Sequence, residues 1–216
     1  MPFLISLVVL LLLHPLTVEL DRVRWFRLAF MVVLAVAVYA LSGKRRDLFV
    51  ALALGLPALL AQSVAYWVPG RASIGVASAL TLLFLGFVTF VMLANVLRGG
   101  SVGADRITGA TCVFLLLGLV WTLIYNLIAL AEPGAFRGID LEENLSGSGG
   151  ESGFIYFSFV TLTTLGYGDI TPTLPLSRTV TWMEAVVGQL YLAILVARLV
   201  GLHVSNKGEE RRPRSD

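Results

Sequence analysis

Charged residues are scarce in this chain. Asp, Glu, Lys and Arg make up 14% of its 216 residues, whereas hydrophobic residues make up 57%, and the mean hydropathy is +0.85. In ordinary soluble domains about a quarter of the residues are charged. The composition of this chain therefore excludes an ordinary soluble domain. The net charge of +2 gives no indication of nucleic-acid binding in so apolar a chain.

Cysteine is almost absent. The single Cys112 excludes an intrachain disulfide, and its place in an apolar run favours a small buried hydrophobe. The few polar residues inside the apolar runs form no metal-ligand or nucleophile constellation. We therefore predict no enzyme, no catalytic residue and no cofactor.

Long apolar runs dominate instead. Runs of this length predict transmembrane helices, because about 20 residues at 1.5 Å rise cross the hydrocarbon core. Six are predicted: Pro2 to Val18, Trp25 to Leu41, Leu48 to Val68, Ser73 to Leu97, Ile107 to Ala131 and Thr179 to Leu202. The first could be mistaken for a signal peptide, but it lacks a basic start and an A-x-A-like cleavage site, so we predict a retained helix.

The fourth run, Ser73 to Leu97, contains no charged residue. A voltage sensor needs several Arg or Lys in one segment, since each charge moved through 100 mV yields about 2.3 kcal/mol. Residues 1–98 are therefore predicted to form a four-helix bundle that is not a charged voltage sensor, followed by a cytoplasmic linker at 99–106.

Basic residues favour one orientation. With both termini in the cytoplasm, nine basic residues lie inside and six outside. The inner set is Lys44, Arg45, Arg46, Arg98, Arg106, Lys207, Arg211, Arg212 and Arg214. The outer set is Arg22, Arg24, Arg27, Arg71, Arg137 and Arg178. Arg198, near the inner end of the last run, could reach the headgroups or an anionic lipid.

One motif stands between the last two runs: Thr163-Thr164-Leu165-Gly166-Tyr167-Gly168-Asp169. It resembles the selectivity filter of potassium channels, in which backbone carbonyls replace the hydration shell of the ion. Carbonyls that point one way need alternating backbone geometry, which Gly166 and Gly168 supply without a Cβ penalty. The resemblance covers Ile107 to Leu202 and implies K⁺ sites at Thr164, Leu165, Gly166, Tyr167 and Gly168. Leu165 replaces the commoner Val or Ile.

The resemblance also implies a fold. We predict an all-α membrane protein of the six-transmembrane, single-pore-loop prokaryotic type, with four amino-terminal helices followed by a pore domain at 107–203. That domain comprises an outer helix, a flexible turret at 132–153, a pore helix at 154–164, the filter at 164–168 and an inner helix at 179–202, and a short cytoplasmic tail at 204–216 follows. Because the motif occurs once, four copies must enclose the ion path, which predicts a homotetramer.

Several residues are predicted to support the filter. Tyr156 and Phe157 occupy the places where the family has an aromatic pair around the filter, usually tryptophans, and Thr163 and Asp169 flank the loop. Glu184 is an acid inside a predicted membrane helix, hence a candidate functional residue. It would either join a ring of four carboxylates or bond a pore-helix threonine, Thr161 or Thr163, and we favour the second.

The inner helix carries a further pattern. Gly188 marks either a hinge or a close helix contact. From there, helical spacing places Gln189, Leu192, Val196 and Val200 on one stripe. This stripe would line the cavity and form an apolar gate, unless it serves ordinary helix packing.

These features predict a potassium-selective channel in the plasma membrane, typical of a bacterial inner membrane, passive and not gated by voltage through its fourth segment. Its partners would be three further copies of itself, membrane lipids, K⁺ and a regulatory protein, with no nucleic acid. The alternative is a weakly selective or normally silent cation channel that needs a partner or lipid signal.

Overall fold

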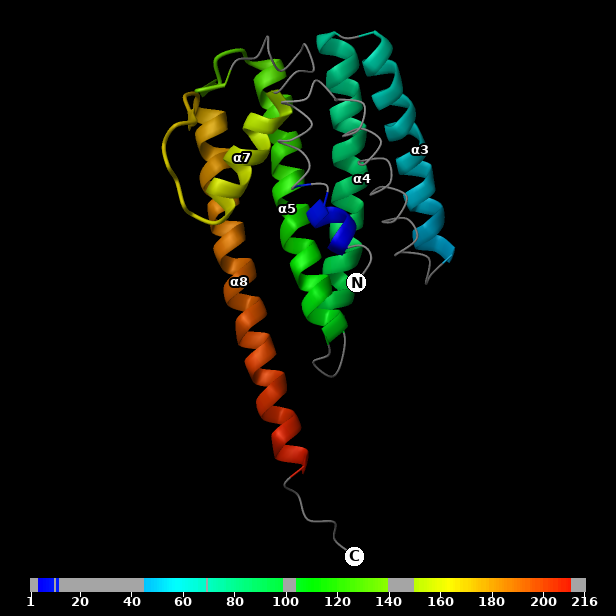
Figure 1. Cartoon of the computed structure of the whole chain (residues 1–216), viewed down its shortest axis with the longest axis vertical. Coiled ribbons are helices and arrows are strands. Elements are labelled where there is room, and N and C mark those ends of the chain that lie inside the picture. The colour runs from blue at the N-terminus through cyan, green and yellow to red at the C-terminus, as the bar shows by residue number, and fades with distance from the viewer. Residues whose placement is uncertain are drawn as a thin grey trace, which may run out of the picture.

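Long helices make up almost all of the computed structural model in Figure 1, which describes residues 4–9, 11, 45–68, 70–98, 104–139 and 150–210. The elements are α3 (Arg45–Trp67), α4 (Arg71–Arg98), α5 (Ala104–Ala131), β1 (Phe136–Arg137), α7 (Gly150–Leu162), β2 (Thr171–Pro172) and α8 (Pro175–Glu210). Residues 4–9 are also helical. The predicted second segment, 25–41, and most of the first lie outside the described residues.

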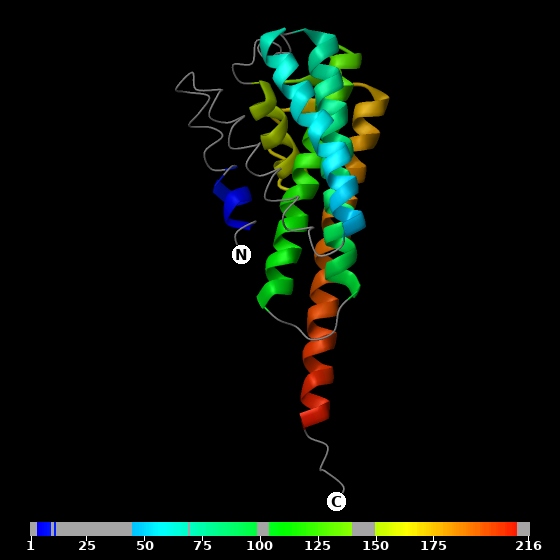
Figure 2. The same ribbon diagram turned by 90° about the vertical axis from the view of Figure 1, so that its right-hand side faces the viewer.

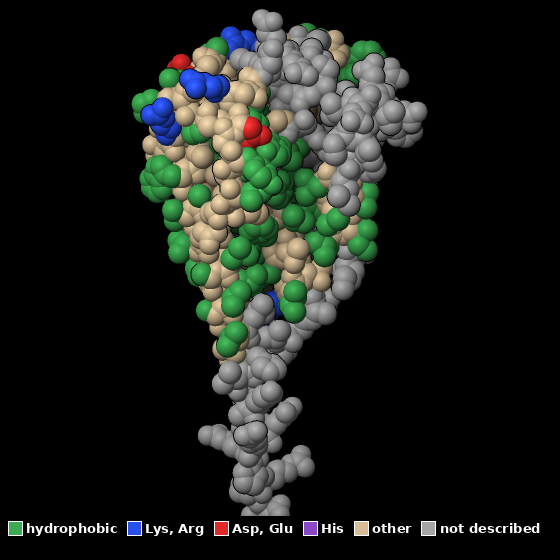
Figure 3. Space-filling view, turned by 60° about the vertical axis from the view of Figure 1, so that its left-hand side comes forward, with side chains coloured by type: hydrophobic (Ala, Val, Ile, Leu, Met, Phe, Trp, Pro, Cys, Tyr) green, Lys and Arg blue, Asp and Glu red, His purple; other side chains and the backbone are tan. Residues whose placement is uncertain are grey.

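Four of the described helices are long and apolar enough to cross a membrane: Arg45–Trp67, Arg71–Leu97, Arg106–Ala131 and Pro175–Arg198. They correspond to the third to sixth predicted segments. Hydrophobic side chains cover much of the face shown in Figure 3, and most of its charged side chains lie toward the upper end. The prediction of a helical membrane protein is confirmed in this coarse form.

Small residues bring α3 and α4 together. A Cβ on Gly55 would lie 3.0 Å from the ring of Phe84, so the helices approach closely there. Gln62 Nε2 donates to Thr81 Oγ1 across the same contact at 3.2 Å. Ser73 holds the connecting turn, since its Oγ lies 2.7 Å from the Val68 carbonyl oxygen. These contacts fix an antiparallel helix pair.

Buried apolar residues of α3, α4, α5 and the amino-terminal helical residues form one core cluster. Leu7, Phe84, Val88 and Leu116 are all fully buried there. Cys112 belongs to the same cluster, in agreement with its predicted role as a small hydrophobe. The described helices of the amino-terminal half thus pack directly on α5.

The predicted pore module, hereafter the pore module, consists of α5, α7, the loop after α7, and α8. Helix α7 is short and packs against both α5 and α8 (Figure 1). A second core cluster joins these elements, with Tyr125 of α5, Phe136 of β1, and Phe154 and Phe157 of α7. This cluster packs α7, and with it the start of the loop that carries the motif, against α5 and β1.

Two predicted boundaries are wrong. The turret at 132–153 is not a continuous flexible segment, because residues 132–139 form a turn and strand β1 and because α7 already begins at Gly150. The tail from 204 is helical as far as Glu210, since α8 continues well beyond the ends of α4 and α5 (Figure 2). Smaller differences occur at other ends: α5 begins at Ala104, α7 ends at Leu162 and α8 begins at Pro175.

Candidate functional site

The motif forms an irregular loop between the end of α7 and β2. The carbonyl oxygen of Val160 accepts hydrogen bonds from the backbone N–H groups of Leu165, at 2.9 Å, and Gly166, at 3.3 Å. Thr163 Oγ1 donates to the Phe159 carbonyl oxygen at 2.6 Å. The last turn of α7 therefore anchors the start of the loop through its own unpaired carbonyls.

The backbone of this loop alternates. Thr164, Gly166 and Gly168 have positive φ angles of 58°, 59° and 81°, whereas the residues between them do not. Alternation between right- and left-handed conformations keeps successive carbonyl groups on one side of the chain. The two glycines adopt it freely, as the sequence indicated. Thr164 does so at a cost of order 1–3 kcal/mol, because β-branched residues disfavour the left-handed region.

Tyr156 and Asp169 support the outer part of the loop. Tyr156 Oη donates to Asp169 Oδ2 at 2.6 Å, and Asp169 Oδ1 accepts the N–H of Ile170 at 3.0 Å. The Tyr156 ring also stacks on Tyr167, with centroids 6.5 Å apart and planes 4° from parallel. The predicted aromatic pair is divided, because Phe157 points instead into the core with Tyr125, at 5.0 Å between centroids.

The carboxyl and phenol affect each other's protonation. The hydrogen bond from Tyr156 lowers the pKa of Asp169 below its ordinary value of 3.8. In return, the hydrogen bond to Asp169 raises the pKa of Tyr156 from 10.0 to about 12. Asp169 is therefore a carboxylate, and Tyr156 a neutral donor, across the physiological range.

A short sheet closes the far side of the loop. β1 pairs antiparallel with β2, with Phe136 opposite Pro172 and Arg137 opposite Thr171. Thr173 N donates to the Ala135 carbonyl oxygen at 3.0 Å, and Ser177 Oγ donates to the same oxygen at 2.8 Å. We call this connection between 134–138 and 169–177 the outer clamp. Sequence reasoning missed it, because two-residue strands carry no periodic pattern.

Gly138 makes the clamp tight. Its φ is +90°, and a Cβ there would lie 2.3 Å from the backbone oxygen of Asp169. A glycine in the segment predicted as turret was the available signal, although the composition of that segment suggested a flexible loop instead.

Glu184 lies behind the pore helix and is fully buried. It forms hydrogen bonds with Tyr125 Oη and with Ser158 Oγ, the latter at 2.5 Å. The predicted contact with the pore helix is thus present, but Thr161 and Thr163 were the wrong partners. Burial also excludes the alternative of a carboxylate ring that faces an aqueous cavity.

Gly188 is a point of close contact. A Cβ there would lie 2.3 Å from the carbonyl oxygen of Leu162, the last residue of α7. Of the two roles left open by the sequence, the structure shows close packing, since α8 remains one continuous helix through this point.

The remaining residues of the inner-helix stripe are exposed on the single chain. Gln189 Nε2 donates to Thr164 Oγ1 at 3.1 Å, so it reaches the start of the filter loop. Leu192 is 39% exposed, and Val196 and Val200 are each 58% exposed. Leu192, Val196 and Val200 thus leave a large part of their side chains uncovered by the described residues of their own chain.

Comparison with known proteins adds to this geometry. Residues 113–203 match the family model described as "Ion channel". The match supports an ion channel. It starts within α5, includes α7 and the filter loop, and ends within α8, so it covers the pore module and not the helices before it. No curated protein and no solved structure matches the chain.

The opposite face of α8 contacts both α5 and the preceding helix α4. Tyr191 Oη donates to the Ala110 carbonyl oxygen of α5 at 2.6 Å, and Arg198 donates to the Leu97 carbonyl oxygen at the end of α4. Leu195, between them, packs on the cluster of Val96, Ala110 and Val113. The prediction that Arg198 reaches headgroups missed this contact, which only the position of α4 reveals.

Proposed function

We propose that this chain is one subunit of a homotetrameric, potassium-selective channel. The observation that carries the proposal is the alternating backbone at Thr164, Gly166 and Gly168 within a loop that matches the filter motif. Dehydration of K⁺ needs several oxygens at close range, and carbonyls aligned on one side of each of four loops would supply them. The K⁺ sites are the carbonyl oxygens of residues 164–168 and the hydroxyl of Thr164.

Exposure of α8 supports the tetramer. In the most apolar stretch of α8, only 11% of the residues are buried within the chain. The corresponding share is 44% for α4 and for α5. Exposed residues include Leu165 and Tyr167 of the filter loop and Trp182, Val186 and Leu190 of α8. A filter that faces lipid would have unpaired polar backbone in hydrocarbon. Three further copies, arranged around an axis, would enclose it.

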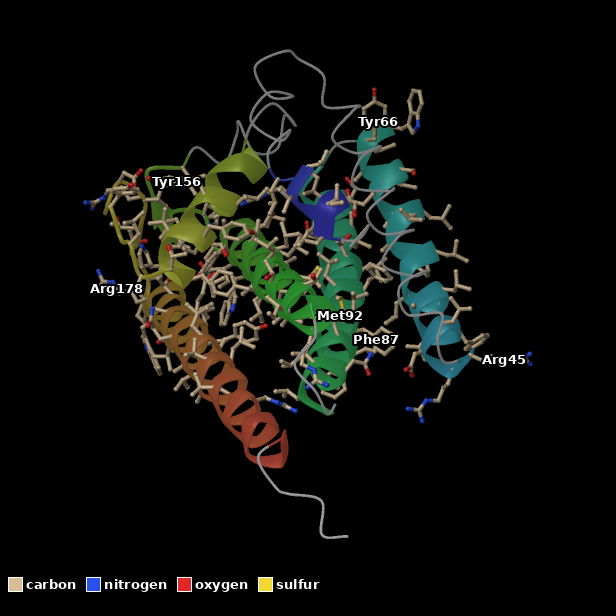
Figure 4. The ribbon with its side chains drawn as sticks, turned by 60° about the horizontal axis from the view of Figure 1, so that its bottom comes forward. Arg45, Tyr66, Phe87, Met92, Tyr156 and Arg178 are labelled. Carbon is tan, nitrogen blue, oxygen red and sulfur yellow. The ribbon has the colours of Figure 1, made fainter. Side chains whose placement is uncertain are left out.

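The arrangement of the helices supports the proposed orientation. α3, α4 and α5 follow one another antiparallel, so Arg45, Arg98 and Arg106 lie toward one end of the bundle. The outer clamp follows the end of α5 that lies away from Arg106 (Figure 1), whereas Figure 4 shows that Tyr156 and Arg178 are also separated sideways from Arg45. We assign the end with Arg45 and Arg98 to the cytoplasm and the outer clamp to the other side of a plasma membrane.

The test is cation flux through purified protein in liposomes. We expect K⁺-driven flux that falls strongly when Na⁺ replaces K⁺, and that disappears in Gly166→Asp. Arg46→Gln, at the exposed start of α3, is the matched control and should conduct as the wild type does.

Other outcomes distinguish the alternatives. Equal K⁺ and Na⁺ flux would contradict potassium selectivity and favour a weakly selective channel. Absence of flux from a folded tetramer would favour a normally silent subunit, whereas a monomer in light scattering would contradict the shared pore itself.

A further inference from the structure

A chain of short oxygen–oxygen contacts runs through the buried interior of the pore module. Tyr125 Oη contacts Glu184 Oε2, and Glu184 Oε1 lies 2.5 Å from Ser158 Oγ. Ser158 Oγ lies in turn 2.7 Å from the carbonyl oxygen of Gly118. Three contacts thus join α5, α8 and α7 behind the filter loop.

Each of these contacts requires a hydrogen atom between its two oxygens. At about 2.5–2.8 Å, two oxygens attract each other only if one of them donates. Tyr125 and Ser158 have one hydroxyl hydrogen each, and the carbonyl of Gly118 has none. With Glu184 as a carboxylate, two hydrogens would have to serve three contacts, and one pair of oxygens would repel.

A proton on Glu184 removes the conflict. Tyr125 then donates to Glu184 Oε2, the carboxylic acid donates through Oε1 to Ser158 Oγ, and Ser158 donates to Gly118. Each of the three contacts then has one hydrogen atom, and the donors all point in one direction, from Tyr125 toward Gly118.

The surroundings favour the uncharged acid. Tyr125, Ser158 and Glu184 are all fully buried in their described surroundings. Tyr125 is the titratable group that α5 presents to Glu184, α7 presents the non-titrating Ser158, and none of the described basic residues forms an ion pair with it. An unpaired carboxylate in an apolar interior is costly, and the usual result is a neutral group.

We propose that Glu184 is an uncharged carboxylic acid at neutral pH and acts as a positioning residue, holding α7 between α5 and α8 by donating to Ser158. Its effect on conduction rests on the proposed function, but its protonation state does not. Ionisation at high pH removes the hydrogen between Glu184 and Ser158, so the two oxygens repel. α7 then loses a contact four residues before Leu162, at whose carbonyl α8 and α7 meet most closely.

The first test is infrared spectroscopy of the purified full chain at neutral pH. The difference spectrum of wild type minus Glu184→Gln should contain the carbonyl stretch of a protonated carboxylic acid, shifted in D₂O. Glu132→Gln, directly after the end of α5, is the control and should leave that carbonyl band in place. A carboxylate band lost from Glu184→Gln would overturn the proposal, whatever the channel conducts.

The second test is the pH profile of K⁺ flux in liposomes. A glutamine can donate to Ser158 and accept from Tyr125, so Glu184→Gln should conduct as the wild type does at neutral pH. At strongly alkaline pH, the wild type should lose about tenfold in flux, because one buried hydrogen bond becomes a repulsion, while Glu184→Gln should not. Identical alkaline profiles for the two proteins would contradict the positioning role.

Ser158→Ala keeps the proposal testable if the glutamine variant fails to fold. It removes the acceptor for the Glu184 proton, so the protonated carbonyl band should remain but move to the frequency of a weaker hydrogen bond. An unchanged band would overturn the proposed contact.

Discussion

Tyr156 and Asp169 close the outer end of the filter loop between them. The phenol donates to the carboxylate at 2.6 Å, while the same ring stacks in parallel on Tyr167. One side chain of α7 thus contacts the loop at two residues, on either side of Gly168.

The first prediction concerns the protonation of this pair. Asp169 raises the pKa of Tyr156 to about 12, so Asp169→Asn should return the pKa of Tyr156 toward 10. The stabilising effect of the raised phenol pKa is fully present below 10 and is lost as the pH rises through about 12. That of the lowered Asp169 pKa is present above 3.8 and is lost as the pH falls through the lowered value.

Ultraviolet absorbance of the phenolate measures this titration, with the Tyr156→Phe protein subtracted to isolate one tyrosine. Phe49→Leu, exposed on α3, serves as a control that should leave the titration unchanged. If Tyr156 titrates near 10 in the wild type, the hydrogen bond is absent in solution.

A second prediction concerns Gly188. Gly188→Ala would place a Cβ 2.3 Å from the Leu162 carbonyl oxygen, so α7 and α8 must move apart. We expect a loss of about 1–3 kcal/mol in stability and reduced K⁺ flux. Thermal unfolding of the detergent-solubilised tetramer measures the first effect.

The same helix offers a matched control for that substitution. Gly201 has nothing within 4 Å of an added Cβ, so Gly201→Ala should stabilise α8 by up to about 1 kcal/mol through helix propensity. Equal effects of the two alanines would contradict the close contact at Gly188.

A third prediction concerns the outer clamp. Gly138 and Gly134 have nearly the same φ, +90° and +91°, but only Gly138 faces the backbone of Asp169. Gly134→Ala should cost about 1 kcal/mol through backbone strain alone. Gly138→Ala should cost clearly more, and it should lower K⁺ selectivity, since it displaces the residue after the filter.

Thermal unfolding and the ratio of K⁺ to Na⁺ flux, taken on both variants, measure the two effects separately. Should Gly134→Ala alter selectivity as much as Gly138→Ala does, the clamp does not act on the filter through Asp169.

A fourth prediction concerns Arg198, which hydrogen-bonds the last turn of α4. On α8 it lies between Val196 and Val200 of the proposed gate but on the opposite face. Arg198→Gln should weaken the restraint on the inner end of α8 and raise K⁺ flux by roughly two- to tenfold, as expected for one hydrogen bond. The K⁺ flux through Arg198→Lys should lie between that of the wild type and that of Arg198→Gln.

Single-channel recording separates a change in open fraction from a change in conductance. A lower conductance with an unchanged open fraction would show that Arg198 acts on the pathway and not on the gate.

Sequence and structure agree where one chemical requirement determines the residues. Gly166 and Gly168 could be assigned positive φ from the motif because carbonyl alignment demands it. Apolar length similarly identified α3, α4, α5 and α8, to within several residues at each end. The same reasoning did not reach Thr164, since its left-handed conformation contradicts its local preference.

Agreement ends where contacts depend on how helices are rotated. The motif suggested a threonine partner for Glu184, yet α7 turns Ser158 toward it, and Tyr125 comes from a helix 59 residues away in the chain. Arg198 had no visible partner because the end of α4 is distant in sequence. Such contacts are set by tertiary packing, which single-chain patterns do not contain.

The outer clamp has a consequence for the helices that precede the pore module. α5 packs on α4 along its length, and its outer end continues directly into β1, which is paired with the strand after the filter. At the inner end, Arg198 joins α8 to the same α4. A tilt of α4 within the membrane would therefore act on both ends of the proposed pore at once. A stimulus that moves the first half of the chain would then affect the filter and the gate together.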